Sequence, residues 1–103
     1  MLLNFLLRIL LNFKNMDIKT RKNIESLVFK KLVKHFRQNT KVQNIDLMNL
    51  AGFCRNCLSK WYMSSAKKNG IQITYDEAKK IIYGMPYEKW KKKYQKESKI
   101  KLK

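Results

Sequence analysis

The chain contains very few of the residues from which turn-rich folds are built. Its 103 residues include three glycines and one proline, whereas β-sandwiches and barrels need frequent turns made with these residues. Apolar residues make up 45 % of the sequence, a share that is ordinary for a globular protein. A chain of this length is expected to form one domain. These features together predict an all-α fold.

Helical spacing and end signals divide most of the chain into segments. Apolar residues keep helical spacing over residues 17–39, with Asp17 or Thr20 available to cap the first turn. A short helix is predicted to begin near Asn44 and to run into Gly52. From residue 53 the apolar stripe continues through both cysteines to Asn69-Gly70. We therefore predict a compact array of four to five helices around a central Cys-x-x-Cys helix.

Two further helices are indicated in the last third of the chain. The pattern Thr74-x-x-Glu77 is a capping box, and Gly84 is placed to end the helix that it begins. Pro86 suits the first turn of a last helix. The few residues around Ile71 and Ile73 are too short a run of alternation to predict a strand.

The two ends of the chain differ from the middle. Residues 1–13 are strongly apolar, and Asn4, Arg8 and Asn12 recur every fourth residue. A helix of this length is too short to cross a bilayer, and the segment lacks the features of a signal peptide. An interfacial anchor, a packed helix and a wrongly assigned start before Met16 remain open, and we favour the last. We predict an extension over 1–15, a helical domain over 16–95 and a basic disordered tail over 96–103.

The net charge of +17 raises the question of nucleic-acid binding. Of the 24 basic residues, twenty are lysine and four are arginine, although nucleic-acid readers favour arginine. The excess is spread along the chain, with one dense patch in residues 89–103. A solvated lysine surface is therefore favoured, and a nucleic-acid-binding accessory protein that uses residues 17–38 and the tail is the alternative.

The two cysteines define the candidate site. On a helix, Cys54 and Cys57 project from one face, so that two thiolates can share an ion. A tetrahedral site needs two more ligands, for which His35 and Asp46 are the candidates. Such a site suits zinc or iron better than magnesium or calcium, and a second chain or water can complete it. The alternatives are core packing of two small apolar side chains and, less favoured, thiol redox chemistry.

Catalysis has few candidate residues in this chain. There is one histidine and there are seven acidic residues, and no Gly-rich phosphate loop, Ser-His-Asp set or paired carboxylates are present in the sequence. We identify no catalytic residue, and an enzyme is the less favoured interpretation. The absence of a disulfide framework favours a reducing, cytoplasmic setting.

Two stretches resemble a known family. Residues 42–62, which contain the run Ala51-Gly52-Phe53-Cys54-Arg55-Asn56-Cys57, and residues 82–91, which contain Tyr83-Gly84-Met85-Pro86, resemble the short bacterial proteins grouped as domain of unknown function 1244. The resemblance runs from about Met16 to Gln95. It implies a small, mainly helical fold in the bacterial cytoplasm and a start near Met16, and it supplies no activity. The polar and aromatic residues that stand in its signature are Asn44, Asp46, Asn49, Cys54, Arg55, Asn56, Cys57, Trp61 and Tyr62.

The leading hypothesis from the sequence is a small helical binding or interaction protein. It is expected to form a homodimer and to hold a metal or ligand at Cys54 and Cys57 with help from His35 and Asp46. No transmembrane segment is predicted.

Overall fold

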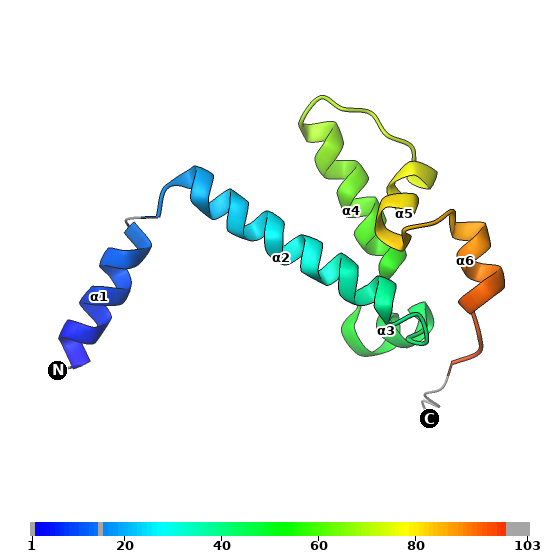
Figure 1. Ribbon diagram of the computed structural model, residues 1–103, viewed down its shortest axis with the longest axis horizontal. Helices are drawn as coiled ribbons and strands as arrows, with labels where there is room; N and C mark the ends of the chain where they lie inside the picture. Colours follow the sequence, from blue (N-terminus) through cyan, green and yellow to red (C-terminus); the bar gives the residue numbers. More distant parts are fainter. Residues whose placement is uncertain (1, 15, 99–103) are drawn as a thin grey trace. The chain divides into compact units, whose positions relative to one another are not determined.

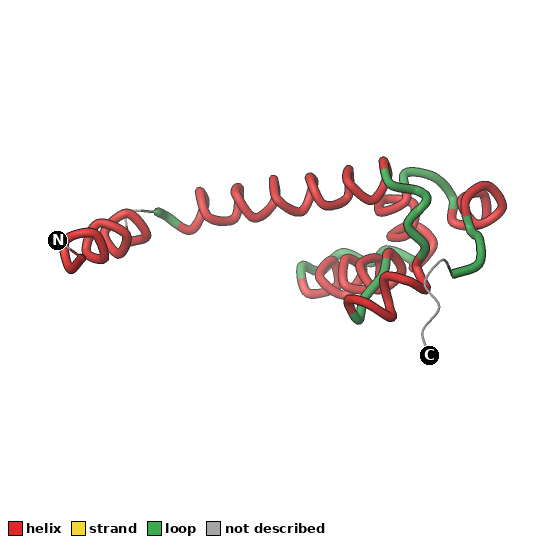
Figure 2. The backbone as a smooth tube through the Cα atoms, turned by 90° about the horizontal axis from the view of Figure 1, so that it is seen from below, coloured by secondary structure: helices red, strands yellow, loops and turns green. Residues whose placement is uncertain are grey.

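The computed structural model describes residues 2–14 and 16–98, with side chains described for residues 2–10 and 16–98. These residues form six α-helices: α1 (Leu2–Lys14), α2 (Ile18–Gln38), α3 (Asn44–Ala51), α4 (Arg55–Lys68), α5 (Tyr75–Tyr83) and α6 (Tyr87–Tyr94) (Figure 1). Loops join them, and the described residues contain no strand (Figure 2). The all-α prediction is confirmed. The predicted count of four to five helices is wrong, because the apolar N-terminal segment forms a helix of its own.

The chain divides into two units, Met1–Leu32 and Val33–Lys103. In the first unit, most described side chains are exposed. In the second unit, α5 packs against α4 and α6 packs against α5. Its apolar core consists of Val33, Phe36, Cys54, Leu58, Ala78, Ile82, Tyr83 and Trp90.

Local signals set most of the helix ends where the sequence predicts them. Asp17 accepts a hydrogen bond from the backbone N–H of Thr20 at 2.6 Å. Thr74 and Glu77 form the complete capping box at the start of α5. Gly84 ends that helix with φ at 77°, a left-handed conformation that favours glycine. These signals act within a few residues, so the sequence alone is enough to place them.

Long-range contacts satisfy the carboxyl ends of three helices in the second unit. Arg55 donates to the carbonyls of Phe36 and Asn39 at the end of α2. Arg37 donates to the carbonyls of Ile81 and Ile82 near the end of α5. A basic side chain is favourable there, because the last carbonyls have no partner within the helix and carry partial negative charge.

The third of these contacts uses an amide in place of a guanidinium. Buried Gln43 donates to the carbonyl of Tyr94, the last residue of α6, at 3.1 Å. Its side-chain oxygen accepts from the backbone N–H of Lys96 at 2.7 Å. The segment before α3 is thereby joined to the segment after α6, and both belong to the second unit.

The predicted central Cys-x-x-Cys helix is not observed. Gly52 ends α3 with φ at 76°, and Cys54 is extended with φ at −143° and ψ at −174°. Helix α4 begins only at Arg55, so Cys54 lies just before the helix and Cys57 lies in its first turn. The apolar stripe runs on through this region, but the turn at Gly52 interrupts the helix that the stripe suggests.

Among the described residues, no helix has both the length and the apolar character needed to cross a bilayer. After α6, Ser98 hydrogen-bonds to Asp46, and residues 99–103 lie outside the described residues. The predicted disordered tail, the domain boundaries and the start near Met16 stay predictions.

Candidate sulfur site

Three sulfur atoms lie close together at the turn between α3 and α4. The Sγ atoms of Cys54 and Cys57 are 3.9 Å apart. The Sγ atom of Cys57 is 3.6 Å from the Sδ atom of Met48 in α3 and can donate its hydrogen to it. Both cysteines are free thiols.

The turn at Gly52 allows Met48 to lie beside Cys57. The N–H of Gly52 donates to the carbonyl of Met48 at 3.0 Å, which closes the last turn of α3. A Cβ atom at Gly52 would have no heavy atom within 4 Å. The positive φ angle therefore accounts for glycine here, rather than a lack of space.

The site is open on one side. Cys54 is buried, Cys57 is half-buried and Met48 is 42 % exposed. Helix α4 also begins here without a side-chain cap, so its positive end favours negative charge near Cys54. A ligand can approach the sulfur atoms from water while the protein holds Cys54 in place.

Arg55, next to Cys54, is the most fully engaged polar residue of this region. It is 1 % exposed, and it donates to Val42 O at 2.7 Å and to Asn44 Oδ1 at 3.0 Å, in addition to its two contacts at the end of α2. Its guanidinium carbon lies 5.2 Å from the ring centre of Phe36 and 4.9 Å from that of Trp90. All these partners are neutral. Burial lowers the pKa of Arg55, and the charge interactions with Tyr83 and with Cys54 act in the opposite direction.

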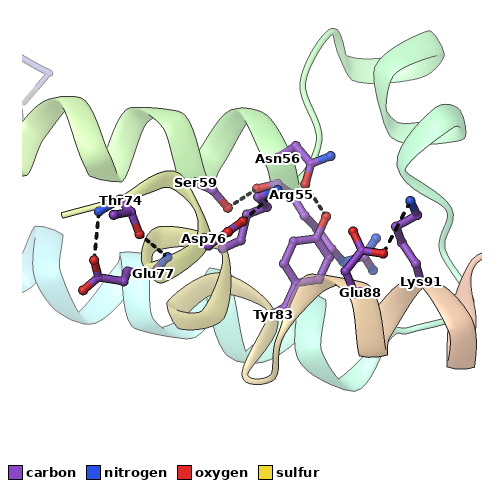
Figure 3. A network of polar contacts seen from close by, with 10 residues as sticks. Arg55, Asn56, Ser59, Thr74, Asp76, Glu77, Tyr83, Glu88 and Lys91 are labelled. Carbon is purple, nitrogen blue, oxygen red and sulfur yellow. Dashed lines mark hydrogen bonds and ion pairs between the residues drawn. The ribbon is translucent and has the colours of Figure 1, made fainter.

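A chain of polar contacts links the starts of α3 and α4 to the end of α5. Asn44 donates to the hydroxyl of Tyr83 at 2.9 Å. That hydroxyl donates to Asn56 Oδ1 at 2.6 Å (Figure 3). Burial raises the pKa of Tyr83 well above its usual range, although the hydrogen bond from Asn44 acts the other way. The two amides and the phenol therefore fix the first turn of α4, in which Cys57 lies.

Residues 42–101, more than half of the chain, match the family described as protein of unknown function (DUF1244). The chain belongs to this family. No match was found among the curated proteins.

The DUF1244 match covers the three sulfur-bearing residues and Arg55, but Phe36 and Asn39, which accept hydrogen bonds from Arg55, lie before the matched residues. Met48, Cys54, Arg55 and Cys57 all fall within residues 42–101, whereas α1 and α2 precede this segment. The family description carries no activity.

Two of the four predicted metal ligands are brought together. His35 is exposed, and its ring is 3.5 Å from the side-chain nitrogen of Asn39. Asp46 is buried and bonds to Ser98. Within residues 2–14 and 16–98, no three His, Cys, Asp or Glu side chains form a group suited to a metal. The structure thus pairs Cys54 with Cys57 without gathering a third ligand of these types around them.

The remaining signature residues have different surroundings. Asn44, Arg55 and Asn56 form the polar support described above. Asn49 is exposed on α3. Trp61 is 55 % exposed and stacks on Phe53 with ring centres 5.7 Å apart. Tyr62 is half-buried.

Sequence reasoning missed Met48 as a member of the site. It stands among the apolar residues of α3, and its side chain carries no charge that marks it as a ligand. The available signal was a thioether six residues before Cys54, with a glycine between them that can reverse the chain.

Proposed function

We propose that the protein binds a soft transition-metal ion through Cys54, Cys57 and Met48. The observation that supports the proposal is the spacing of the sulfur atoms, 3.9 Å and 3.6 Å. With metal–sulfur bonds of about 2.3 Å, neighbouring sulfur ligands lie about 3.8 Å apart in a tetrahedral site and about 4.0 Å apart in a trigonal one. Two of the three sulfur pairs, both of which include Cys57, are therefore already near the spacing of metal ligands.

The kind of sulfur narrows the choice of ion. Thiolate and thioether ligands select soft ions, of which Cu(I) accepts a thioether well. Zinc, the ion favoured with iron by the sequence, is held mainly by thiolate, imidazole and carboxylate, and needs a fourth ligand here. We therefore propose Cu(I) as the preferred ion and zinc or iron as the alternatives. Binding releases the proton of each thiol that becomes a ligand.

The surroundings favour exchangeable binding over a closed structural centre. Closed structural zinc sites supply four protein ligands, whereas this site offers three sulfur atoms and an exposed edge at Met48. Buried Arg55 and the amide of Asn56 hold the first turn of α4 in place. This arrangement suits a protein that binds an ion and passes it on or responds to it.

Metal titration of the reduced protein tests the proposal. Cu(I) is added anaerobically in competition with a chromogenic chelator, and one ion per chain is expected. Loss of a residue that only hydrogen-bonds to a metal ligand typically lowers metal affinity by ~10–100-fold. Cys57 is proposed as a direct ligand, so Cys57→Ser should lower the affinity by more than that. Met48→Leu should weaken Cu(I) binding by about tenfold and leave zinc affinity unchanged.

Met63→Leu is the matched control, since Met63 lies in α4 outside the sulfur site and is half-buried. It should bind Cu(I) as the wild type does. The proposal is rejected if the Cys54→Ser, Cys57→Ser double variant folds and binds the ion with unchanged affinity. Equal effects of Met48→Leu and Met63→Leu would remove Met48 from the ligand set.

A second candidate function is reversible disulfide formation between the same thiols. It is supported by the position of the pair, with Cys54 just before α4 and Cys57 in its first turn, since a helix N-terminus favours the thiolate. Closing the bond would bring the sulfur atoms from 3.9 Å to about 2.0 Å and transfer two electrons and the two thiol protons to a partner disulfide, which is reduced to two thiols. If both thiols still react with an alkylating agent after equilibration in oxidised glutathione, this candidate is rejected.

The homodimer and the nucleic-acid alternative also stay proposals. The homodimer is tested by the mass of the protein in solution. Nucleic-acid binding is supported by net charge alone, so it requires affinity that falls steeply with salt and depends on oligonucleotide sequence or structure.

A further inference from the structure

Helix α1 presents apolar side chains that nothing within its unit covers. Every described apolar side chain from residue 2 to residue 10 is 47–75 % exposed. Asn4 and Arg8, one turn apart, mark the polar stripe of the same helix. A soluble surface rarely carries so continuous an apolar face, and such faces mark contact with another molecule or a membrane.

The part of α2 that belongs to the first unit also exposes apolar side chains. Ile18, Leu27 and Val28 are exposed, with fractions from 58 to 72 %. Residues 1–32 contain seven basic and two acidic side chains, a net charge of +5. The first unit thus combines exposed apolar side chains with positive charge, which is the combination found in helices that bind membrane surfaces.

The positive charge of the first unit helps to decide which kind of partner its apolar face binds. A second copy of the same face would bring like charges together, which opposes association. A nucleic acid would meet the basic groups but would leave the leucines without an apolar partner. An anionic bilayer offers phosphates at its surface and hydrocarbon directly below, and so satisfies both kinds of side chain.

The length of α1 determines how it can lie. Its 13 residues extend about 20 Å as a helix, which is less than the ~30 Å of a bilayer's hydrocarbon core. We propose that α1 lies in the plane of an anionic phospholipid surface, with Leu6 and Leu10 in the acyl boundary and Arg8 at the phosphates. Basic side chains early in α2, such as Lys19 and Lys22, add electrostatic attraction.

Vesicle co-sedimentation of the full 103-residue chain tests this inference. The chain should sediment with vesicles that contain phosphatidylglycerol and bind much more weakly to pure phosphatidylcholine. The Leu6→Asp, Leu10→Asp double variant should lower the bound fraction at least tenfold. Each change removes a leucine that would be buried in the membrane, and ~1.4 kcal/mol of lost binding free energy corresponds to a factor of ten.

The matched control is Leu50→Asp, because Leu50 is 67 % exposed on α3 and lies outside the first unit. It should sediment as the wild type does. Circular dichroism should show the same urea midpoint for both leucine variants, since neither position belongs to the apolar core. The proposal is overturned if the double variant still binds, if vesicle charge has no effect, or if the leucines of α1 control only self-association in solution.

Discussion

Removing the guanidinium of Arg55 is the most informative test of how this fold is held together. Arg55→Met keeps much of the volume between Phe36 and Trp90 but leaves four acceptors without their donor. Three of these bonds measure 2.7–3.0 Å and the fourth measures 3.4 Å. The variant is expected to fold with clearly reduced stability.

The magnitude follows from opposing contributions. Hydrogen bonds to a charged group contribute ~1.5–3 kcal/mol each, so three good bonds suggest a loss of ~5–9 kcal/mol. Burying a charge itself costs several kcal/mol, which the apolar replacement recovers. Val42 and Asn39 are exposed, so water can hydrogen-bond to some of the acceptors that lose the guanidinium. We expect a net destabilisation of about 2–4 kcal/mol, a large share of the ~5–15 kcal/mol typical of a domain.

Urea unfolding followed by circular dichroism provides the measurement. The midpoint of Arg55→Met should fall by roughly 1–2 M at an unchanged slope. Arg37→Met is the matched control, because Arg37 also contacts the end of a helix but is exposed, and it should cost at most about 1 kcal/mol. If the two variants unfold at the same urea concentration, the argument that buried Arg55 organises this unit is refuted.

Two further predictions concern α5 and the two turns. Tyr83→Phe should cost about 1–2 kcal/mol, because Nδ2 of Asn44 and Oδ1 of Asn56 each lose the hydrogen bond to the Tyr83 hydroxyl. Folding raises the pKa of Tyr83, so burial of the neutral phenol contributes stability below pH 10, the ordinary pKa, and this contribution is lost as the pH rises above that value. Urea unfolding measured at several pH values should show that Tyr83→Phe removes this loss of stability at alkaline pH. An unchanged pH profile would contradict the assignment. Gly84→Ala should destabilise more than Gly52→Ala in the same assay. A Cβ at Gly84 would lie 2.9 Å from Nε of Arg37 and would displace that side chain from the carbonyls to which it donates, whereas a Cβ at Gly52 has open space. Equal losses would mean that the backbone angle alone decides both.

The sequence by itself determined the fold class and most helix ends. Few glycines, one proline and helical spacing exclude turn-rich folds, and the signals at Asp17, Thr74 and Gly84 act on neighbours within one turn. Local interactions of this kind need no knowledge of the rest of the chain. The cysteine pair was likewise visible as a candidate site from its spacing alone.

Only the tertiary structure decided what surrounds that pair. The acceptors of Arg55 lie 11–19 residues away in the sequence, and no periodic pattern reveals that a charged side chain will be buried between two aromatic rings. The turn at Gly52 moved Cys54 out of the helix and placed Met48 beside Cys57. Helix periodicity reports which residues face the same side, whereas the direction in which the next helix leaves a turn depends on contacts that form across the folded chain.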